Sequence, residues 1–150
     1  MVYTMQTKKA MRIAYIAHKD QVDKSGMPYI FHPYHLAEQM RDEASVCVAL
    51  LHDVIEDTDF TYDDLRELGI SESVIGSIKL LTHNKSTAYT DYIQSIKDSG
   101  DEIAIKVKLA DLRHNSDITR LELIEEKAIE SSNRYKDAIR QLNSALSTQA

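Results

Sequence analysis

Residues 47–58, which read CVALLHDVIEDT, constrain the fold of this chain more than any other stretch. Their apolar residues recur at helical spacing, which predicts a buried amphipathic helix. Into this run the sequence inserts His52, Asp53, Glu56 and Asp57, three or four residues apart and therefore on one helical face. Three crowded carboxylates repel one another, and buried charges in proteins are paired or bound to metal. The stretch therefore favours a cation site over a solvated acidic face.

The composition is that of a soluble globular protein. The chain has 150 residues, of which 43% are hydrophobic and 28% charged, enough for a single domain over residues 1–150 with a sizeable core. A formal net charge of −6 without basic runs argues against a nucleic-acid binder or an anionic-membrane binder. A small phosphorylated ligand remains compatible, because a few local cations suffice to bind it.

The single cysteine and the N-terminus indicate a cytoplasmic location. Cys47 has no partner for an intramolecular disulfide and lies on the apolar side of its helix, so we expect a core residue in a reducing compartment. No continuous apolar segment follows Lys8, Lys9 and Arg12, as a signal peptide requires. No apolar run reaches the length of a membrane span.

The scarcity of helix breakers favours an all-α fold. Only four Gly and two Pro are spread over the chain, without repeats or low-complexity segments. Helices are predicted at about 4–20, 34–41, 62–68, from Ser71 or Ser73 to 81, and at 87–98, with Gly69 and Gly100 as stops. Residues 23–33 form a loop on their Gly and Pro content, and Pro33 should hold His32 extended just before a helix.

Two later segments leave alternatives open. Residues 103–109 alternate like a strand but also fit a helix, and we predict a helix because no second strand of comparable quality exists. Residues 121–146 carry a near-heptad apolar pattern that predicts one long C-terminal helix. Packing on the domain core is the favoured interpretation of this helix, and a homodimer seam is the alternative.

Three separated segments offer metal ligands: His32, the pair His52 and Asp53, and Asp111. Two imidazoles and two carboxylates form a mixed nitrogen and oxygen site, which suits manganese, iron or zinc better than a closed structural zinc site. Such a metal polarises phosphate oxygens and lowers the pKa of a bound water. Glu56 and Asp57, one turn beyond, would orient the attacking water or protonate the leaving oxygen.

The order of these segments is more specific than any one of them. A lone histidine such as His18, His35, His83 or His114 is interpreted as structural or as a surface residue. The order His, His-Asp and Asp along an all-α chain is the metal-binding pattern of HD-domain phosphohydrolases.

The resemblance extends to a narrower group. Residues 17–33 (AHKDQVDKSGMPYIFHP), 49–58 (ALLHDVIEDT) and 107–115 (VKLADLRHN) resemble the hydrolase domain of RelA/SpoT-type proteins and the free-standing small alarmone hydrolases. The match covers about residues 8–120. It implies an all-α HD-domain helical bundle that hydrolyses the 3′-pyrophosphate of guanosine tetra- or pentaphosphate to GDP or GTP and pyrophosphate. The long enzymes' synthetase domain has no room here, so no pyrophosphokinase activity is expected.

The resemblance also implies roles for individual residues. It implies a manganese ion bound by His32, His52, Asp53 and Asp111. Glu56 and Asp57 match the catalytic acidic pair of the family, and the positions that match substrate contacts are Lys24, Ser25 and Asn115.

Three departures from the family pattern fall at or near substrate-contacting positions. Asp23 stands where the family's loop usually has Arg, and Thr82-His83 replaces a common Thr-Lys. Arg113 is displaced by one position after Asp111, a rotation of about 100° on a helix. None of these changes affects a metal ligand, so the metal chemistry has more support than the substrate.

Structural interpretations stand beside the functional ones. Lys24 could be an ordinary loop cation, Ser25 a turn residue and Asn115 a helix cap. Tyr29 is interpreted as core or loop packing. Lys106 and Lys108 are interpreted as a solvated helix face, although Lys108, three residues before Asp111, could reach a phosphate.

Two other functions remain open at this point. One is an HD phosphohydrolase for another nucleotide or phosphate ester, and the other is a non-catalytic nucleotide-binding module. The intact acidic cluster argues against the second, because mutually repelling groups are costly to keep together without a cation.

Overall fold

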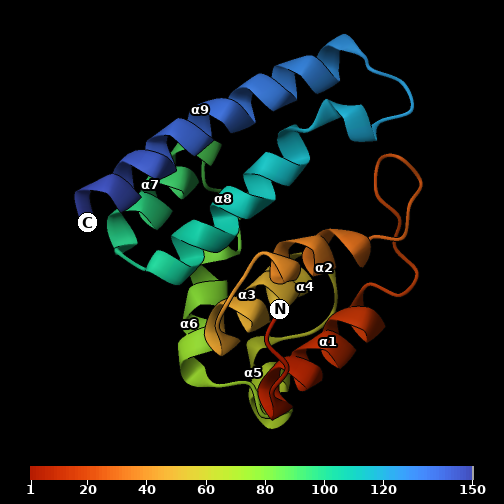
Figure 1. The fold of residues 1–150 in the computed structure, drawn as a ribbon, viewed down its shortest axis with the longest axis vertical. Helices are drawn as coiled ribbons and strands as arrows, with labels where there is room; N and C mark the ends of the chain where they lie inside the picture. Colours follow the sequence, from red (N-terminus) through yellow and green to blue (C-terminus); the bar gives the residue numbers. More distant parts are fainter. Residues whose placement is uncertain (150) are drawn as a thin grey trace.

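The computed structural model describes the backbone of residues 1–149 and the side chains of residues 1–146. This part of the chain is helical, and its only bridge is an isolated one between Val22 and Pro28. Among the described helices none is long and apolar enough to cross a membrane. The predicted all-α class is confirmed (Figure 1). The elements are α1 (Met5–Ala17), α2 (Phe31–Glu38), α3 (Glu43–Leu51), α4 (Val54–Asp57), α5 (Tyr62–Glu67), α6 (Glu72–Leu81), α7 (Tyr89–Ser99), α8 (Glu102–Ser116), η1 (Ile118–Arg120) and α9 (Glu126–Gln149).

Helix α3 lies at the centre of the core, where α1, α2, α6 and α8 contact it. Every residue from Ser45 to Leu51 is buried, so the helix is apolar on all sides rather than amphipathic. Cys47 is a free, fully buried core residue, as predicted. A central helix that is buried all round fixes the position of whatever follows its last turn.

The prediction of one continuous helix over residues 47–58 is wrong. Helix α3 ends at Leu51 and α4 begins at Val54, so His52 and Asp53 lie in a break between them. The His52 ring Nδ1 lies 2.7 Å from the carbonyl oxygen of Ala49, the group that accepts the N–H of Asp53 in a continuous helix. This side-chain hydrogen bond competes with the helical one, which accounts for the break.

The expected extended conformation of His32 is also wrong. Helix α2 begins at Phe31, so His32 lies within its first turn and Pro33 follows it in the same turn. Proline is tolerated there because the N–H groups of a first turn have no partner within the helix. The consequence is that His32 projects from a rigid helix rather than from the loop.

The predicted boundaries of α5, α6 and α7 agree with the structure, whereas α1 and α2 both end earlier than predicted, at Ala17 and Glu38. Thr61 and Asp64 form the predicted capping box at α5. Gly69 and Gly100 follow α5 and α7 with φ angles of 94° and 67°, which only glycine adopts readily. Residues 103–109 belong to α8, whose buried residues lie against α3 and α6 on one side and α9 on the other.

Helix α9 packs along α8 and α7 (Figure 1). It begins at Glu126 rather than near residue 121, because the side chain of Asp117 first caps the short helix η1. Ala138, Leu142 and Ala145 are buried on its inner face. The connection between α8 and α9 thereby comes to lie beside the loop between α1 and α2, where Asp23 and Arg120 are 3.6 Å apart.

Candidate metal centre and active site

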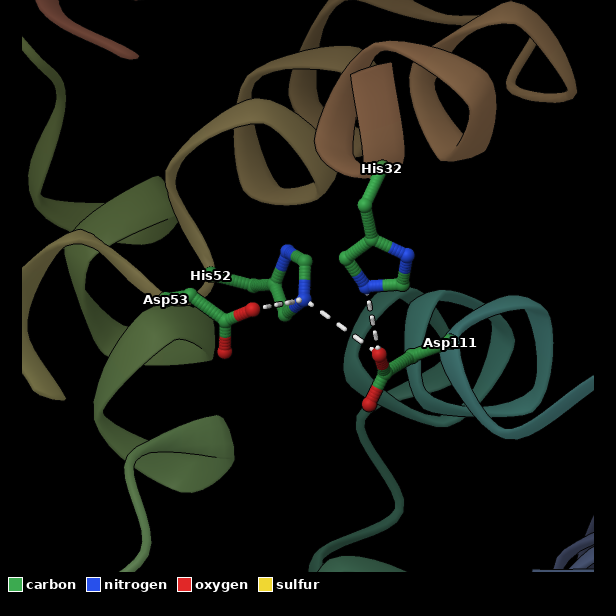
Figure 2. A group of neighbouring side chains, drawn as sticks. All are labelled: His32, His52, Asp53 and Asp111. Atoms are coloured by element: carbon green, nitrogen blue, oxygen red, sulfur yellow. Dashed lines mark hydrogen bonds and ion pairs between the residues drawn. The ribbon is translucent and has the colours of Figure 1, made fainter. Parts of the chain in front are cut away.

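Four side chains from three places in the chain converge beside the core (Figure 2). His32 comes from the first turn of α2, His52 and Asp53 from the break between α3 and α4, and Asp111 from the middle of α8. One ligand atom from each lies within 4.8 Å of the others. The sequence-predicted metal ligands are thus brought together.

The shortest contacts join imidazole nitrogens to carboxylate oxygens. His32 Nε2 lies 2.9 Å from Asp111 Oδ1, and His52 Nε2 lies 2.9 Å from Asp53 Oδ2 and 3.6 Å from Asp111 Oδ1. Three of the four residues are buried, and Asp53 is half-buried. This donor set is the mixed nitrogen and oxygen kind that holds divalent transition metals with positions left for water.

The outer nitrogens of both histidines are occupied, which turns their Nε2 atoms toward the cluster. His52 Nδ1–H donates to the carbonyl of Ala49, and His52 Nε2 is buried without a hydrogen bond among the described residues. His32 Nδ1 lies 2.6 Å from His114 Nδ1. Burial and the nearby Arg120 charge lower the pKa of His114 to about 4, so His114 is neutral near pH 7 and shares one proton with His32 across this contact. Such outer hydrogen bonds orient metal-binding histidines.

The charges of the cluster fit a bound cation. Burial alone would lower the pKa of His52, but the carboxylates of Asp53 and Asp111 reverse this and raise it well above the usual value. A proton on His52 therefore balances the carboxylates when no metal is bound, and a metal would displace it. The His52 Nε2 atom and the carboxylates that it faces are a donor set that fits a divalent metal.

Three residues outside this set hydrogen-bond to its carboxylates. Tyr29 donates its hydroxyl proton to Asp53, Lys108 Nζ lies 2.8 Å from Asp111 Oδ2, and Asn115 Nδ2 lies 3.0 Å from Asp111 Oδ1. Two interpretations made from the sequence are therefore wrong. Tyr29 does more than pack, because it hydrogen-bonds to Asp53, and Lys108 does not lie on a solvated helix face. Lys106 is exposed, as predicted.

The spacing in α8 could have revealed part of this arrangement. Lys108, Asp111 and Asn115 are three and four residues apart, so they share one helical face. No local signal links Tyr29 to Asp53, or His114 to His32, because both contacts depend on the packing of separate segments. His114 was interpreted as structural or as a surface residue, and it instead contacts a proposed ligand.

Glu56 and Asp57 lie next to the ligand cluster and reach the surface. Oxygens of Asp53, Glu56 and Asp57 lie within 4.8 Å of one another. Glu56 Oε1 accepts the backbone N–H of His83 at 2.6 Å, so the departure at Thr82-His83 borders the acidic pair. Partial burial, together with the charges of Asp53 and Glu56, raises the pKa of Asp57 to about 6. A carboxyl group with that pKa exchanges protons readily near neutral pH.

A cleft of about 340 Å³ extends from His32 and Asn115 toward α9. Lys24 and Ser25 line it from the loop between α1 and α2, and Arg120 lines it from η1. All three residues predicted to contact a substrate therefore face one cavity beside the metal ligands. Arg113 lies elsewhere, exposed and 3.4 Å from Asn143.

Asp23 organises its own loop. Its Oδ1 accepts the backbone N–H groups of Ser25 and Met27 at 2.8 and 3.0 Å and the Ser25 hydroxyl at 2.7 Å. Its Oδ2 faces the Arg120 guanidinium at 3.6 Å, across the entrance between the loop and η1. Ser25 thus has the turn role as well as a place in the cleft. Arg120, which the sequence did not single out, is a guanidinium in this cleft.

Comparisons with known proteins find relatives by sequence and by fold, although no family model matches the chain. The bifunctional (p)ppGpp synthase/hydrolase SpoT of Escherichia coli is 38% identical over 123 residues, covering 71% of this chain and 18% of the relative. A guanosine-3′,5′-bis(diphosphate) 3′-pyrophosphohydrolase of Haemophilus influenzae is 36% identical over 115 residues, covering 69% and 17%. The chain therefore spans less than a fifth of the length of these curated relatives.

A solved structure matches over the whole fold. It is a metazoan orthologue of SpoT described as hydrolysing ppGpp, with a TM-score of 0.73 and 20% identity over 100% of this chain and 98% of that one. The shared fold agrees with the predicted HD-domain bundle. The chain is therefore similar in sequence to one segment of the SpoT-type (p)ppGpp proteins and shares its helical fold with this solved structure.

Proposed function

We propose that this chain is a metal-dependent phosphohydrolase that removes the 3′-pyrophosphate from guanosine tetra- or pentaphosphate. The products are GDP or GTP and pyrophosphate. One observation carries the proposal: His32, His52, Asp53 and Asp111 converge beside an acidic pair and at the end of a cleft. The sequence similarity to SpoT over 71% of the chain supports the substrate class.

His32, His52, Asp53 and Asp111 are the proposed metal ligands, and manganese is the proposed metal. The mixture of imidazole and carboxylate donors is compatible with Mn²⁺. When bound, the metal supplies positive charge that neutralises phosphate oxygens as the reaction proceeds. The chain's contribution is to hold the ligands at fixed places on α2, α8 and the α3–α4 break, so that little rearrangement is needed.

Glu56 and Asp57 are the proposed catalytic residues. Glu56, held by the backbone N–H of His83, orients the attacking water. The water oxygen forms a bond to the 3′ phosphorus while the bond from that phosphorus to the ribose 3′ oxygen breaks. Asp57, with a pKa of about 6, accepts the proton of the water and returns it to the departing 3′ oxygen.

Lys24, Ser25 and Asn115 are the proposed substrate contacts. Lys24 offers a cation to the phosphates, Ser25 lines the loop side of the cleft, and Asn115 bridges the cleft and Asp111. The proposed partner is one small phosphorylated nucleotide in the cytoplasm. A homodimer through α9 is not part of the proposal, because Ala138, Leu142 and Ala145 of the expected seam are buried within this chain.

A second candidate substrate is favoured by Asp23. Where the family's loop usually carries Arg, this chain has a carboxylate that binds its own loop, and the nearby guanidinium comes from Arg120 in η1. A cleft whose guanidinium comes from η1 rather than from this loop could select a different nucleotide or phosphate ester for the same metal chemistry.

The test is a substrate panel with two matched variants. Purified protein with Mn²⁺ is incubated with ppGpp, pppGpp and other nucleotides, and pyrophosphate and orthophosphate are measured separately. We expect pyrophosphate from the guanosine 3′ position. Asp53→Ala should abolish turnover and keep the helical circular dichroism signal, whereas Asp59→Ala, at an exposed neighbour, should retain activity. Release of phosphate from other nucleotides alone would reject the alarmone assignment, and a fully active Asp53→Ala would reject the metal site.

A further inference from the structure

Lys108 is a largely buried lysine that directly contacts a proposed metal ligand. Its side chain is only 13% exposed, its Nζ lies 2.8 Å from Asp111 Oδ2, and it lies 5.2 Å from the centre of the Tyr92 ring. Tyr92 is itself buried and donates its hydroxyl proton to the carbonyl of Leu81. Lys106, two residues earlier on the same helix, is exposed. The two lysines of α8 therefore have different surroundings.

The contacts of Asp111 divide between its two oxygens. Oδ2 contacts the Lys108 ammonium, while Oδ1 faces His32 at 2.9 Å, Asn115 at 3.0 Å and His52 at 3.6 Å. The ammonium thus occupies the side of the carboxylate that points away from the two histidines. Burying an ammonium is unfavourable unless a partner compensates its charge, and Asp111 is that partner here.

We propose that Lys108 is a permanent counter-ion of Asp111, one that balances its charge and fixes its rotation so that Oδ1 faces the two histidines before a metal binds. Lys108 is then a positioning residue that acts through Asp111. The inference rests on the proposed metal site and not on the identity of the substrate.

The alternative is that Lys108 binds a substrate phosphate directly. Its burial, its contact with Asp111 and its absence from the residues that line the cleft argue against this role. The two roles also predict different measurements, because a counter-ion matters most when no metal is present.

Thermal unfolding of the full chain separates these roles. Wild type, Lys108→Met and Lys106→Met are treated with chelator and then measured with and without MnCl₂. Without metal, Lys108→Met should unfold on the order of 10 °C below wild type, because it leaves a buried carboxylate unpaired. Mn²⁺ should recover most of that loss, since it places a cation beside Asp111. Lys106→Met should follow wild type in both conditions, and Lys108→Arg should lose much less than Lys108→Met.

Two outcomes would overturn the proposal. An equal loss with and without Mn²⁺ would show that Lys108 only packs, and a Lys108→Met variant as stable as wild type without metal would show that it compensates no charge. If Lys108→Met does not fold without metal, the double variant with Asp111→Asn decides. It should fold better than Lys108→Met alone, because both members of the pair are neutral. A double variant that is no more stable contradicts the proposal.

Kinetics supply an independent readout if the proposed hydrolase activity is found. With saturating Mn²⁺, Lys108→Met should lower kcat with little change in KM, and Lys108→Arg should restore part of the loss. A raised KM at unchanged kcat would place the ammonium on the substrate and overturn the positioning role. Absence of turnover in wild type would reject the proposed function, while the unfolding experiment would still decide the role of Lys108.

Discussion

At the scale of single residues, Asp57 combines a proposed catalytic role with an electrostatic cost. It shares a small volume with Asp53 and Glu56, and its pKa of about 6 lies above the usual 3.8 of an aspartate. Between about pH 4 and 6, Asp57 therefore keeps its proton in the folded state and has lost it in the unfolded state. Stability must fall as the pH rises through that window, because the ionised form is disfavoured in the folded protein.

Asp57→Asn should stabilise the metal-free protein and inactivate it. Asparagine removes the charge at any pH, so the gain in melting temperature should be largest above pH 6 and fade toward pH 4. Unfolding at pH 7.5 and at pH 4.5 in the presence of chelator measures this gain, with Asp59→Asn as the exposed control. An equal gain at both pH values would contradict the raised pKa.

Tyr29→Phe should weaken metal binding. The variant removes the hydroxyl that donates to Asp53 and keeps the ring in place, and losses of outer hydrogen bonds of this kind typically reduce metal affinity about 10- to 100-fold. Calorimetric titration with Mn²⁺ measures the affinity, and Tyr15→Phe, at an exposed position on α1, is the matched control. Unchanged affinity would mean that Tyr29 only packs, as its sequence context suggests.

The sequence predicts the four ligands better than the residues that support them. Chain order and residue type are enough to single out His32, His52, Asp53 and Asp111 as proposed ligands, and the folded chain brings all four together. Tyr29, His114 and Arg120 act through contacts between distant segments, which no local pattern records. The supporting residues were therefore missed for a physical reason.

At the scale of helices, the break between α3 and α4 shows that the spacing of apolar residues does not predict every helix end. Apolar spacing predicted one helix across residues 47–58, but a histidine ring that binds the Ala49 carbonyl ends α3 at Leu51. Helices with strong stops were predicted well, because Gly69 and Gly100 impose their own backbone geometry. The sequence therefore predicts helices ended by glycine better than helices ended by a side-chain hydrogen bond.

Leu142→Ala tests how α9 is held. Leu142 is fully buried on the inner face of α9, so the substitution should cost about 2–5 kcal/mol of unfolding free energy. Ile129→Ala, at a residue 45% exposed on the same helix, should change stability by less than about 0.5 kcal/mol. Urea unfolding of both variants gives the comparison. Similar effects at the two positions, or a dependence on protein concentration, would instead indicate a seam between two copies.

At the scale of the whole molecule, the packing of α9 on α8 forms the cleft beside the metal ligands. The loop between α1 and α2 supplies one wall and η1 with α9 the other, so most of the cleft wall comes from segments that carry none of the four proposed metal ligands. The all-α class follows from the sequence because breakers are rare. The charge arrangement at the cleft does not, because the contact between Asp23 and Arg120 exists only in the folded chain.

Metal removal should act on the whole molecule. After chelation, the carboxylates of the cluster have only the His52 proton and the Lys108 ammonium beside them as positive charge. Mn²⁺ should therefore raise the melting temperature of wild type, and it should raise that of Asp53→Ala by less. Thermal scans at several Mn²⁺ concentrations measure the difference. Identical shifts for both proteins would place the binding ion elsewhere.

The most direct test of the central claim follows the oxygen atom of the attacking water. Wild type with Mn²⁺ and ppGpp is allowed to react in ¹⁸O-water, and the products are identified by mass spectrometry. Attack at the 3′ phosphorus predicts unlabelled GDP and pyrophosphate that carries one ¹⁸O. Labelled GDP, labelled orthophosphate as the sole product, or an unreacted substrate would contradict the proposed 3′-pyrophosphohydrolase.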